Sequence, residues 1–82
     1  MHTLVVMPAL FEAENVKDVV PRAKRAAPGA DVMVVVDRRD DGSTCDAAKE
    51  AGARVACGMA QRLGALLRYG IARGLEEGYD VI

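Results

Sequence analysis

The stretch VMVVVD, residues 32–37, decides the fold of this chain. Five consecutive apolar residues, most of them β-branched, predict a strand that is buried on both faces. Strands of this kind are typical of parallel sheets that carry helices on either side. Asp37 ends the apolar run, so we expect its carboxylate at the carboxyl edge of the sheet.

Toward the amino terminus, a first strand and a helix precede this stretch. Residues 4–7, LVVM, predict a strand that Pro8 ends. Pro28 and Gly29 mark the end of the helix that follows. Pro21 lies inside this helix, and we expect the helix to bend there rather than end. Its apolar residues recur at helical spacing: Val16, Val19, Val20 and Ala23.

Toward the carboxyl terminus, helices and strands continue to alternate. A short helix is predicted through Ala51, with Ser43 or Thr44 as its cap, and residues 54–57 predict a third strand. Leucine and isoleucine at helical spacing predict a long helix over residues 63–75, and residues 79–82 resemble the opening of a fourth strand. The order β-α-β-α-β-α-β predicts an α/β fold, a Rossmann-like parallel sheet with right-handed crossovers.

Length and composition limit the classes of function. The 82 residues, 51% of them hydrophobic, allow one domain, residues 1–82, with a thin core. Eleven basic and twelve acidic side chains leave no overall field for nucleic acid or an anionic membrane. No apolar run reaches the roughly 20 residues of a transmembrane segment. No basic segment precedes the first apolar run, so we expect no secretory signal. Cys45 and Cys57 have no metal-site spacing, so we expect reduced thiols and a cytoplasmic protein.

Several common chemistries lack the residues they require. No G-x-G-x-x-G or P-loop follows the first strand. His2 is the only histidine and is terminal, so a Ser-His-Asp or Cys-His arrangement has no base. An aspartyl phosphatase needs a second aspartate two residues after Asp37, where Arg39 stands. A receiver-like phosphoacceptor needs acidic residues at the end of the first strand, where Pro8 stands.

Ligands of such sheets bind at the carboxyl ends of the strands. The candidate loops are therefore residues 8–12, 37–43 and 57–64. Asp37 can accept hydrogen bonds from a base or a ribose. Arg62, at the start of the last helix, carries donors suited to a phosphate or to a carboxylate.

The remaining charged and glycine positions have simpler interpretations. Glu12 suits the positive end of a helix. Asp40 and Asp41 could hold a metal, but a solvated acidic loop that Arg38 and Arg39 neutralise is the preferred interpretation. Three glycines interrupt the last helical pattern, and close packing on the sheet is the ordinary reason: Gly64, Gly70 and Gly74.

Taken in order, these segments resemble the amino-terminal half of a family 2 glycosyltransferase with the GT-A fold, in the branch of the dolichyl-phosphate mannose synthases. PALFEAENV (residues 8–16) resembles the family's Pro-Ala-x-Asn-Glu segment, with Phe11 where the family usually has Asn. DDGST (residues 40–44) resembles the acidic loop after the second strand, and GALLRYG (residues 64–70) the glycine-containing helix. Residues 80–82 resemble the strand that leads into the family's DxD motif.

The resemblance implies a site for a nucleoside diphosphate sugar. Pro8, Ala9 and Glu12 would line the nucleotide, Asp37 would bind the base, and Arg62 would lie near the base or the diphosphate. The family's DxD motif holds Mg²⁺ or Mn²⁺, and its ligands and the catalytic base are absent from this chain. We therefore expect an incomplete nucleotide-sugar-binding domain without transferase activity of its own.

Two functional hypotheses follow from these features. The first is the nucleotide-sugar-binding part of an inverting glycosyltransferase, which transfers a sugar from a nucleoside diphosphate sugar to an acceptor, with a polyprenyl phosphate as one candidate acceptor. The alternative is a non-catalytic, truncated α/β domain that forms a homo-oligomer through its exposed sheet edge.

Overall fold

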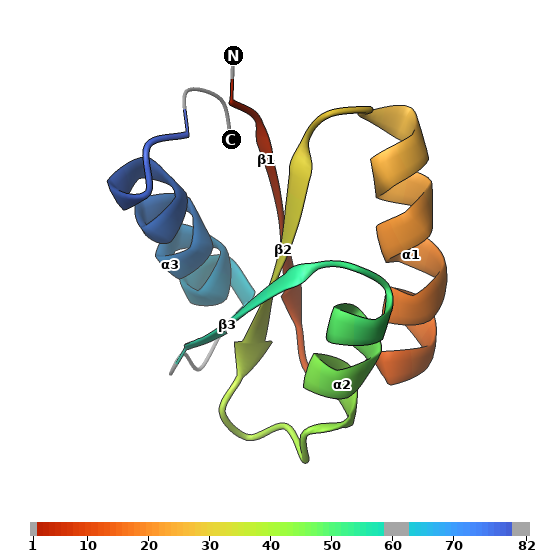
Figure 1. Ribbon diagram of the computed structural model, residues 1–82. Helices are drawn as coiled ribbons and strands as arrows, with labels where there is room; N and C mark the ends of the chain where they lie inside the picture. The colour runs from red at the N-terminus through yellow and green to blue at the C-terminus, as the bar shows by residue number, and fades with distance from the viewer. Residues whose placement is uncertain (1, 59–62, 80–82) are drawn as a thin grey trace.

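The computed structural model describes residues 2–58 and 63–79. Three strands and three helices alternate along them (Figure 1). In chain order they are β1 Leu4–Ala9, α1 Ala13–Ala26, β2 Asp31–Asp37, α2 Ser43–Glu50, β3 Arg54–Gly58 and α3 Leu63–Glu76. The strands are all parallel and lie in the order β1-β2-β3. The predicted α/β class is therefore confirmed, whereas the predicted fourth strand lies outside the described residues except for Tyr79, which is in no strand.

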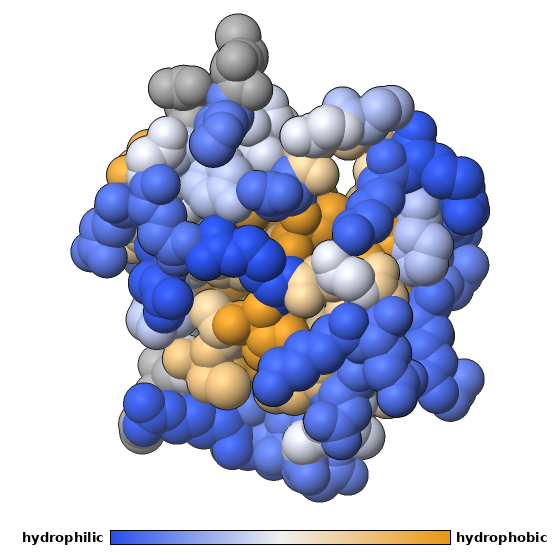
Figure 2. Space-filling model, in the orientation of Figure 1, coloured by the Kyte–Doolittle hydropathy of each residue, from blue (hydrophilic) through white to orange (hydrophobic). Residues whose placement is uncertain are grey.

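The sheet separates two helical layers. Helices α1 and α2 cover one face and α3 covers the other (Figure 1). The core between the sheet and α1 and α2 is built from valine and alanine: Ala9, Val16, Val20, Val32, Val34, Val36, Ala47 and Ala48. The core under α3 contains Leu4, Met33, Val35, Ala56, Leu66 and Tyr79. Figure 2 shows apolar surface between the two layers, with hydrophilic side chains on both sides of it.

Strand β2 is the centre of the sheet, as the sequence predicts. Residues 32–37 are all buried, because each face of the strand meets one of the two cores. Strand β1 differs from its prediction in two respects: Val5, Val6 and Met7 are only half-buried, and the strand continues through Pro8 to Ala9. Half-burial follows from the position of β1 at the edge of the described sheet.

Pro8 fits within β1 because of the side toward which its backbone points. The N–H of Asp31 in β2 donates to the carbonyl of Thr3 at 3.0 Å, so Thr3 faces β2. Backbone groups of successive strand residues alternate between the two sides. Odd-numbered residues of β1 therefore bond to β2, and Pro8 points to the outer edge of the sheet that residues 2–58 and 63–79 form, where its missing N–H costs no ladder bond.

Helix α3 packs closely against the sheet at Gly70. A Cβ atom at this position would lie 2.4 Å from Cγ1 of Val6 and 2.6 Å from Cγ2 of Val35. Close packing, predicted for three glycines of this helix, is thus confirmed at Gly70. The prediction is wrong at Gly64, where a Cβ would meet no atom within 4 Å. Helix α1 runs through Pro21 without ending, as predicted.

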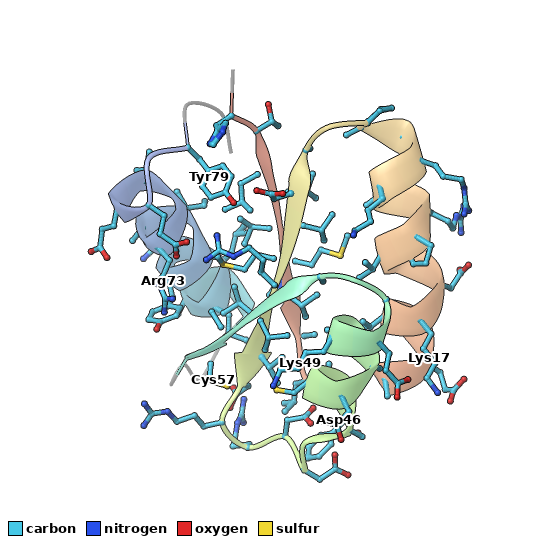
Figure 3. The ribbon with its side chains drawn as sticks, in the orientation of Figure 1. Lys17, Asp46, Lys49, Cys57, Arg73 and Tyr79 are labelled. Carbon is cyan, nitrogen blue, oxygen red and sulfur yellow. The ribbon has the colours of Figure 1, made fainter. Side chains whose placement is uncertain are left out.

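A polar cluster fixes the end of α3 at the amino edge of the sheet. The hydroxyl of Tyr79 donates to Oδ2 of Asp31 at 2.5 Å and accepts from Nη1 of Arg54 at 3.0 Å. Arg54 also forms an ion pair with Glu77. The hydrogen bond to Asp31 raises the pKa of Tyr79, and that from Arg54 lowers the pKa of Glu77. Tyr79 and Arg73 lie at the α3 side of the molecule in Figure 3.

Candidate functional site

The carboxyl edge of the sheet carries two loops that a single carboxylate joins. Oδ2 of Asp40, after β2, accepts hydrogen bonds from the N–H of Phe11, after β1, and from Oγ1 of Thr44, both at 2.6 Å. Oδ1 of Asp40 accepts from the N–H of Gly42 at 2.9 Å. Oγ1 of Thr44 in turn accepts from the N–H of Glu12 at 3.0 Å. The interpretation of Asp40 as a solvated loop residue is therefore wrong, because it holds the two loops together.

Hydrogen bonding determines the ionisation of Asp40. Burial alone would raise its pKa, but the bonds from Thr44 and from the backbone of Phe11 and Gly42 outweigh burial, and the net pKa is lowered. Asp40 is therefore a stable carboxylate at neutral pH.

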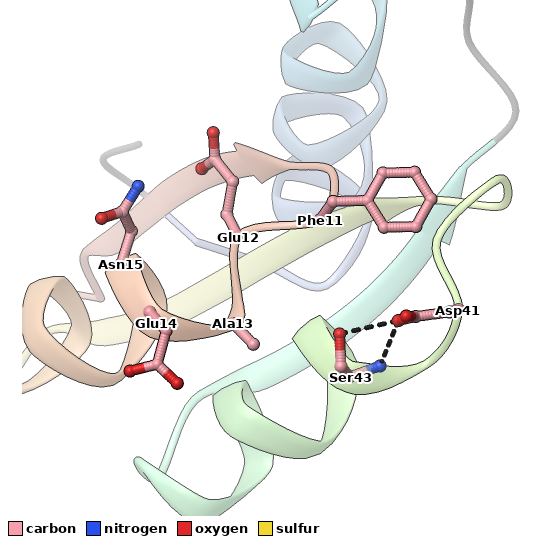
Figure 4. A pocket seen from close by; sticks show the side chains of 7 residues that line it. All are labelled: Phe11, Glu12, Ala13, Glu14, Asn15, Asp41 and Ser43. Atoms are coloured by element: carbon pink, nitrogen blue, oxygen red, sulfur yellow. Dashed lines mark hydrogen bonds between the residues drawn. The ribbon is translucent and has the colours of Figure 1, made fainter.

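The backbone N–H groups at the start of α2 find other acceptors than the sequence predicts. The N-cap position is Gly42, with φ of +98°, and neither Ser43 nor Thr44 caps the helix with its side chain. Instead, Oδ1 of Asp41 accepts from the N–H of Ser43 at 2.9 Å and from its hydroxyl at 2.7 Å (Figure 4). The hydroxyl of Thr44 is buried and bonds to Asp40 and to the N–H of Glu12. The two aspartates thus replace the predicted hydroxyl cap.

Asp37 lies at the carboxyl edge of β2, where the sequence places it. Its side chain is 3% exposed and is bound on both oxygens by Arg39. Nε of Arg39 lies 3.1 Å from Oδ1 and Nη2 lies 2.7 Å from Oδ2, and the backbone N–H of Arg39 donates to Oδ1 at 2.9 Å. These bonds lower the pKa of Asp37 and raise that of Arg39. A ligand that binds Asp37 must therefore displace or accommodate the guanidinium.

Two hollows lie beside the loop that follows β1. One has a volume of about 160 Å³, and Pro8, Ala9 and Glu12 are among the residues that line it. The other has a volume of about 340 Å³ and is drawn in Figure 4. Its lining consists of Phe11, Glu12, Ala13, Glu14, Asn15, Asp41 and Ser43. Glu12 and Asn15 line both hollows. The smaller hollow thus brings together three of the predicted site residues, Pro8, Ala9 and Glu12.

Phe11 is a site residue that the sequence interpretation missed. Its φ of +53° lies in the left-handed region, which a bulky side chain rarely adopts. Its ring is 60% exposed and stands at the rim of the larger hollow (Figure 4). Strained residues of this kind concentrate at functional sites. The glycosyltransferases that the sequence resembles usually have Asn at this position, and Asn tolerates positive φ. That difference in residue type was the signal in the sequence.

Two further predicted site residues lie away from these hollows or outside the described residues. Asp37 lines neither hollow, and Arg62 lies outside the described residues. Within residues 2–58 and 63–79, no three His, Cys, Asp or Glu side chains are grouped to hold a metal ion. Over the same ranges, no helix has both the length and the apolar character needed to cross a membrane.

Comparison with known proteins adds no relative. Searches against protein-family models, curated proteins and solved structures find no match to this chain.

Proposed function

We propose that the chain binds a nucleoside diphosphate sugar at the carboxyl edge of its sheet, as the donor-binding part of a family 2 glycosyltransferase. The sugar acceptor would be a lipid such as a polyprenyl phosphate.

The position of α3 is the observation that carries this proposal. Helix α3 follows β3 but packs chiefly on β1, with Gly70 directly over Val6. It lies on the face opposite α1 and α2 (Figure 1). After β3 the chain therefore crosses to the opposite face of the sheet and returns over β1. A further strand beside β1 would reverse the strand order there. In open α/β sheets, ligands bind in the crevice at such a reversal, outside the carboxyl ends of the strands.

The groups at this crevice suit a hydroxyl-rich ligand. Glu12 and Asn15 line both hollows, and a carboxylate and an amide can bind ribose or sugar hydroxyls. The larger hollow also contains Glu14 and Asp41, so three carboxylates line it and no basic side chain does. A diphosphate would meet repulsion there unless a divalent cation accompanied it. The proposal therefore includes Mg²⁺ or Mn²⁺ supplied with the nucleotide.

Isothermal titration tests the proposal. UDP, GDP and their sugars are titrated into the folded chain with and without Mg²⁺ or Mn²⁺. We expect one of the nucleotides to bind in a metal-dependent manner, and E12Q and D37N to weaken binding about ten-fold or more. E76Q, an exposed carboxylate at the end of α3, is the matched control. Absence of binding by a folded chain would contradict the proposal.

A second candidate function is self-association through the free edge of β1. An apolar hollow of about 450 Å³ lies there, lined by Thr3, Leu4, Val5, Val6, Leu67 and Ile71. An exposed apolar edge is a surface for pairing with another strand. Sedimentation equilibrium separates the two candidates: a dimer that L67K converts to a monomer, without nucleotide binding, would favour self-association.

A further inference from the structure

The two cysteines lie on the same face of the sheet. Cys57 in β3 is the register partner of Val36 in β2, and Val55 is the partner of Val34. Paired residues of neighbouring strands point to the same face. Val36 and Val34 belong to the core under α1 and α2, and Cys45 of α2 packs against that core. The side chain of Cys57 therefore points to the layer that contains Cys45.

The two cysteines also lie at the same height along the layer. Helix α2 ends at Glu50 and β3 begins at Arg54, so a short turn reverses the chain between them. Cys45 is six residues before Ala51, about 9 Å at the rise of a helix. Cys57 is three residues after Arg54, about 10 Å at the rise of a strand. The equal lengths bring Cys45 next to Cys57, which is labelled at the carboxyl end of β3 in Figure 3.

The environments of the two thiols differ. Cys57 is exposed, whereas Cys45 is partly buried. Burial raises the pKa of Cys45, and hydrogen-bonding contact with the Cys57 thiol raises it further. Cys57 is therefore the thiol that a reagent in solution meets first, and Cys45 is held within reach of it.

We propose that Cys45 and Cys57 form an intramolecular disulfide by exchange with a small-molecule disulfide such as oxidised glutathione. The Cys57 thiolate attacks one sulfur of the reagent, the S–S bond breaks, and one glutathione leaves and takes up a proton. The Cys45 thiol then loses its proton to solvent and attacks Sγ of Cys57. This displaces the second glutathione, so two protein thiols are oxidised while one glutathione disulfide is reduced.

The bond would act on the candidate site through α2. It would tie the first turn of that helix to the end of β3. Thr44, the neighbour of Cys45, bonds to Asp40 and to the N–H of Glu12. Oxidation would therefore restrict the two loops that Asp40 joins, and it would also raise the melting temperature by about 10 °C, because the closed loop limits the unfolded chain.

The experiment treats the folded chain with oxidised glutathione and follows it by mass spectrometry and thermal melting. We expect a monomer that is lighter than the reduced chain by two hydrogens and melts higher. C45S should stop at a single glutathione adduct on Cys57, and C57S should react about ten-fold more slowly. C57S changes an exposed side chain and should remain folded. A wild-type chain that retains the Cys57 adduct, or that yields only disulfide-linked dimers, would overturn the proposal.

Discussion

The carboxylate of Asp40 accepts a hydrogen bond of 2.6 Å from the backbone N–H of Phe11, 29 residues away in the sequence. The bond joins the loops that follow β1 and β2, and with Thr44 it determines how the chain leaves both strands. These are the loops that line the hollows of the candidate site. The shape of the site therefore depends on one side chain that need not contact a ligand.

Removal of that carboxylate should destabilise the fold. D40A leaves the N–H groups of Phe11 and Gly42 and the hydroxyl of Thr44 without their acceptor. We expect a loss of about 2 kcal/mol in the free energy of unfolding, measured by urea denaturation. D41A is the matched control, because Asp41 is exposed and its carboxylate bonds to Ser43, and it should cost about 0.5 kcal/mol. Equal losses in the two variants would contradict the assigned role.

Acid should weaken the fold through the same group. The pKa of Asp40 in the folded chain lies below the ordinary value of 3.8. As the pH falls, Asp40 therefore takes up its proton earlier in the unfolded chain than in the folded chain. The stability that the charged form provides is fully present above the unfolded pKa and is lost as the pH falls through the folded pKa. We expect the urea midpoint of the wild type to fall between neutral pH and about pH 3. D40A should show a smaller decrease; an unchanged pH profile would exclude this contribution.

The backbone strain at Phe11 should be relieved by a residue that accepts positive φ. F11N should raise the free energy of unfolding by about 1 kcal/mol, since Asn adopts the left-handed region at lower cost. Ala lacks the polar side chain that lets Asn adopt this region, so F11A keeps most of the strain and should change stability little. Chemical denaturation of the three chains checks the order. Stabilisation by F11A equal to that by F11N would indicate that the exposed ring, not the backbone, carries the cost.

Two glycines of α3 should respond in opposite directions to the same change. G70A places a methyl group against Val6 and Val35, so we expect a loss of about 2 kcal/mol and a shift of α3 away from the sheet. G64A meets open space and removes a flexible residue from a helix, so we expect a gain of about 0.5 kcal/mol. Thermal melting of both variants is the measurement. A loss in both variants would show that the packing difference does not decide their effects.

Arg39 should compete with a nucleotide base for hydrogen bonds to the carboxylate of Asp37. If Asp37 binds the nucleotide as proposed, R39Q frees both carboxylate oxygens and should increase affinity several-fold, measured by titration. The pKa of Asp37, followed by NMR, should rise in the same variant. R38Q carries the same change in net charge and serves as the control. Weaker nucleotide binding by R39Q, but not by R38Q, would instead indicate that Arg39 contacts the ligand. An unchanged pKa of Asp37 in R39Q would contradict the observed ion pair.

The fold was largely predictable because periodicity is a local property. Alternation of the VMVVVD strand with amphipathic segments predicted the three parallel strands and three helices. The end of β1 was not predicted, since Pro8 is tolerated only because its nitrogen points to the free edge. That direction depends on the register with β2, which no local pattern contains.

The site was less predictable for a related reason. Pro8, Ala9 and Glu12 were found as a loop beside a strand end, which is a local inference. The roles of Asp40 and Phe11 depend on a bond between distant loops. The partner of Asp37 is only two residues away, but its identity depends on the turn that returns Arg39 toward the strand. Sequence spacing alone does not specify that conformation.

The orientation of Pro8 also limits how the molecule can aggregate. Any polypeptide that extended the sheet from β1 could form a regular hydrogen-bond ladder only before Pro8, because no N–H is available there. A ladder of that length is marginal as a nucleus for fibrils, which require longer continuous pairing. The apolar edge of β1 therefore carries its own protection against unlimited intermolecular growth.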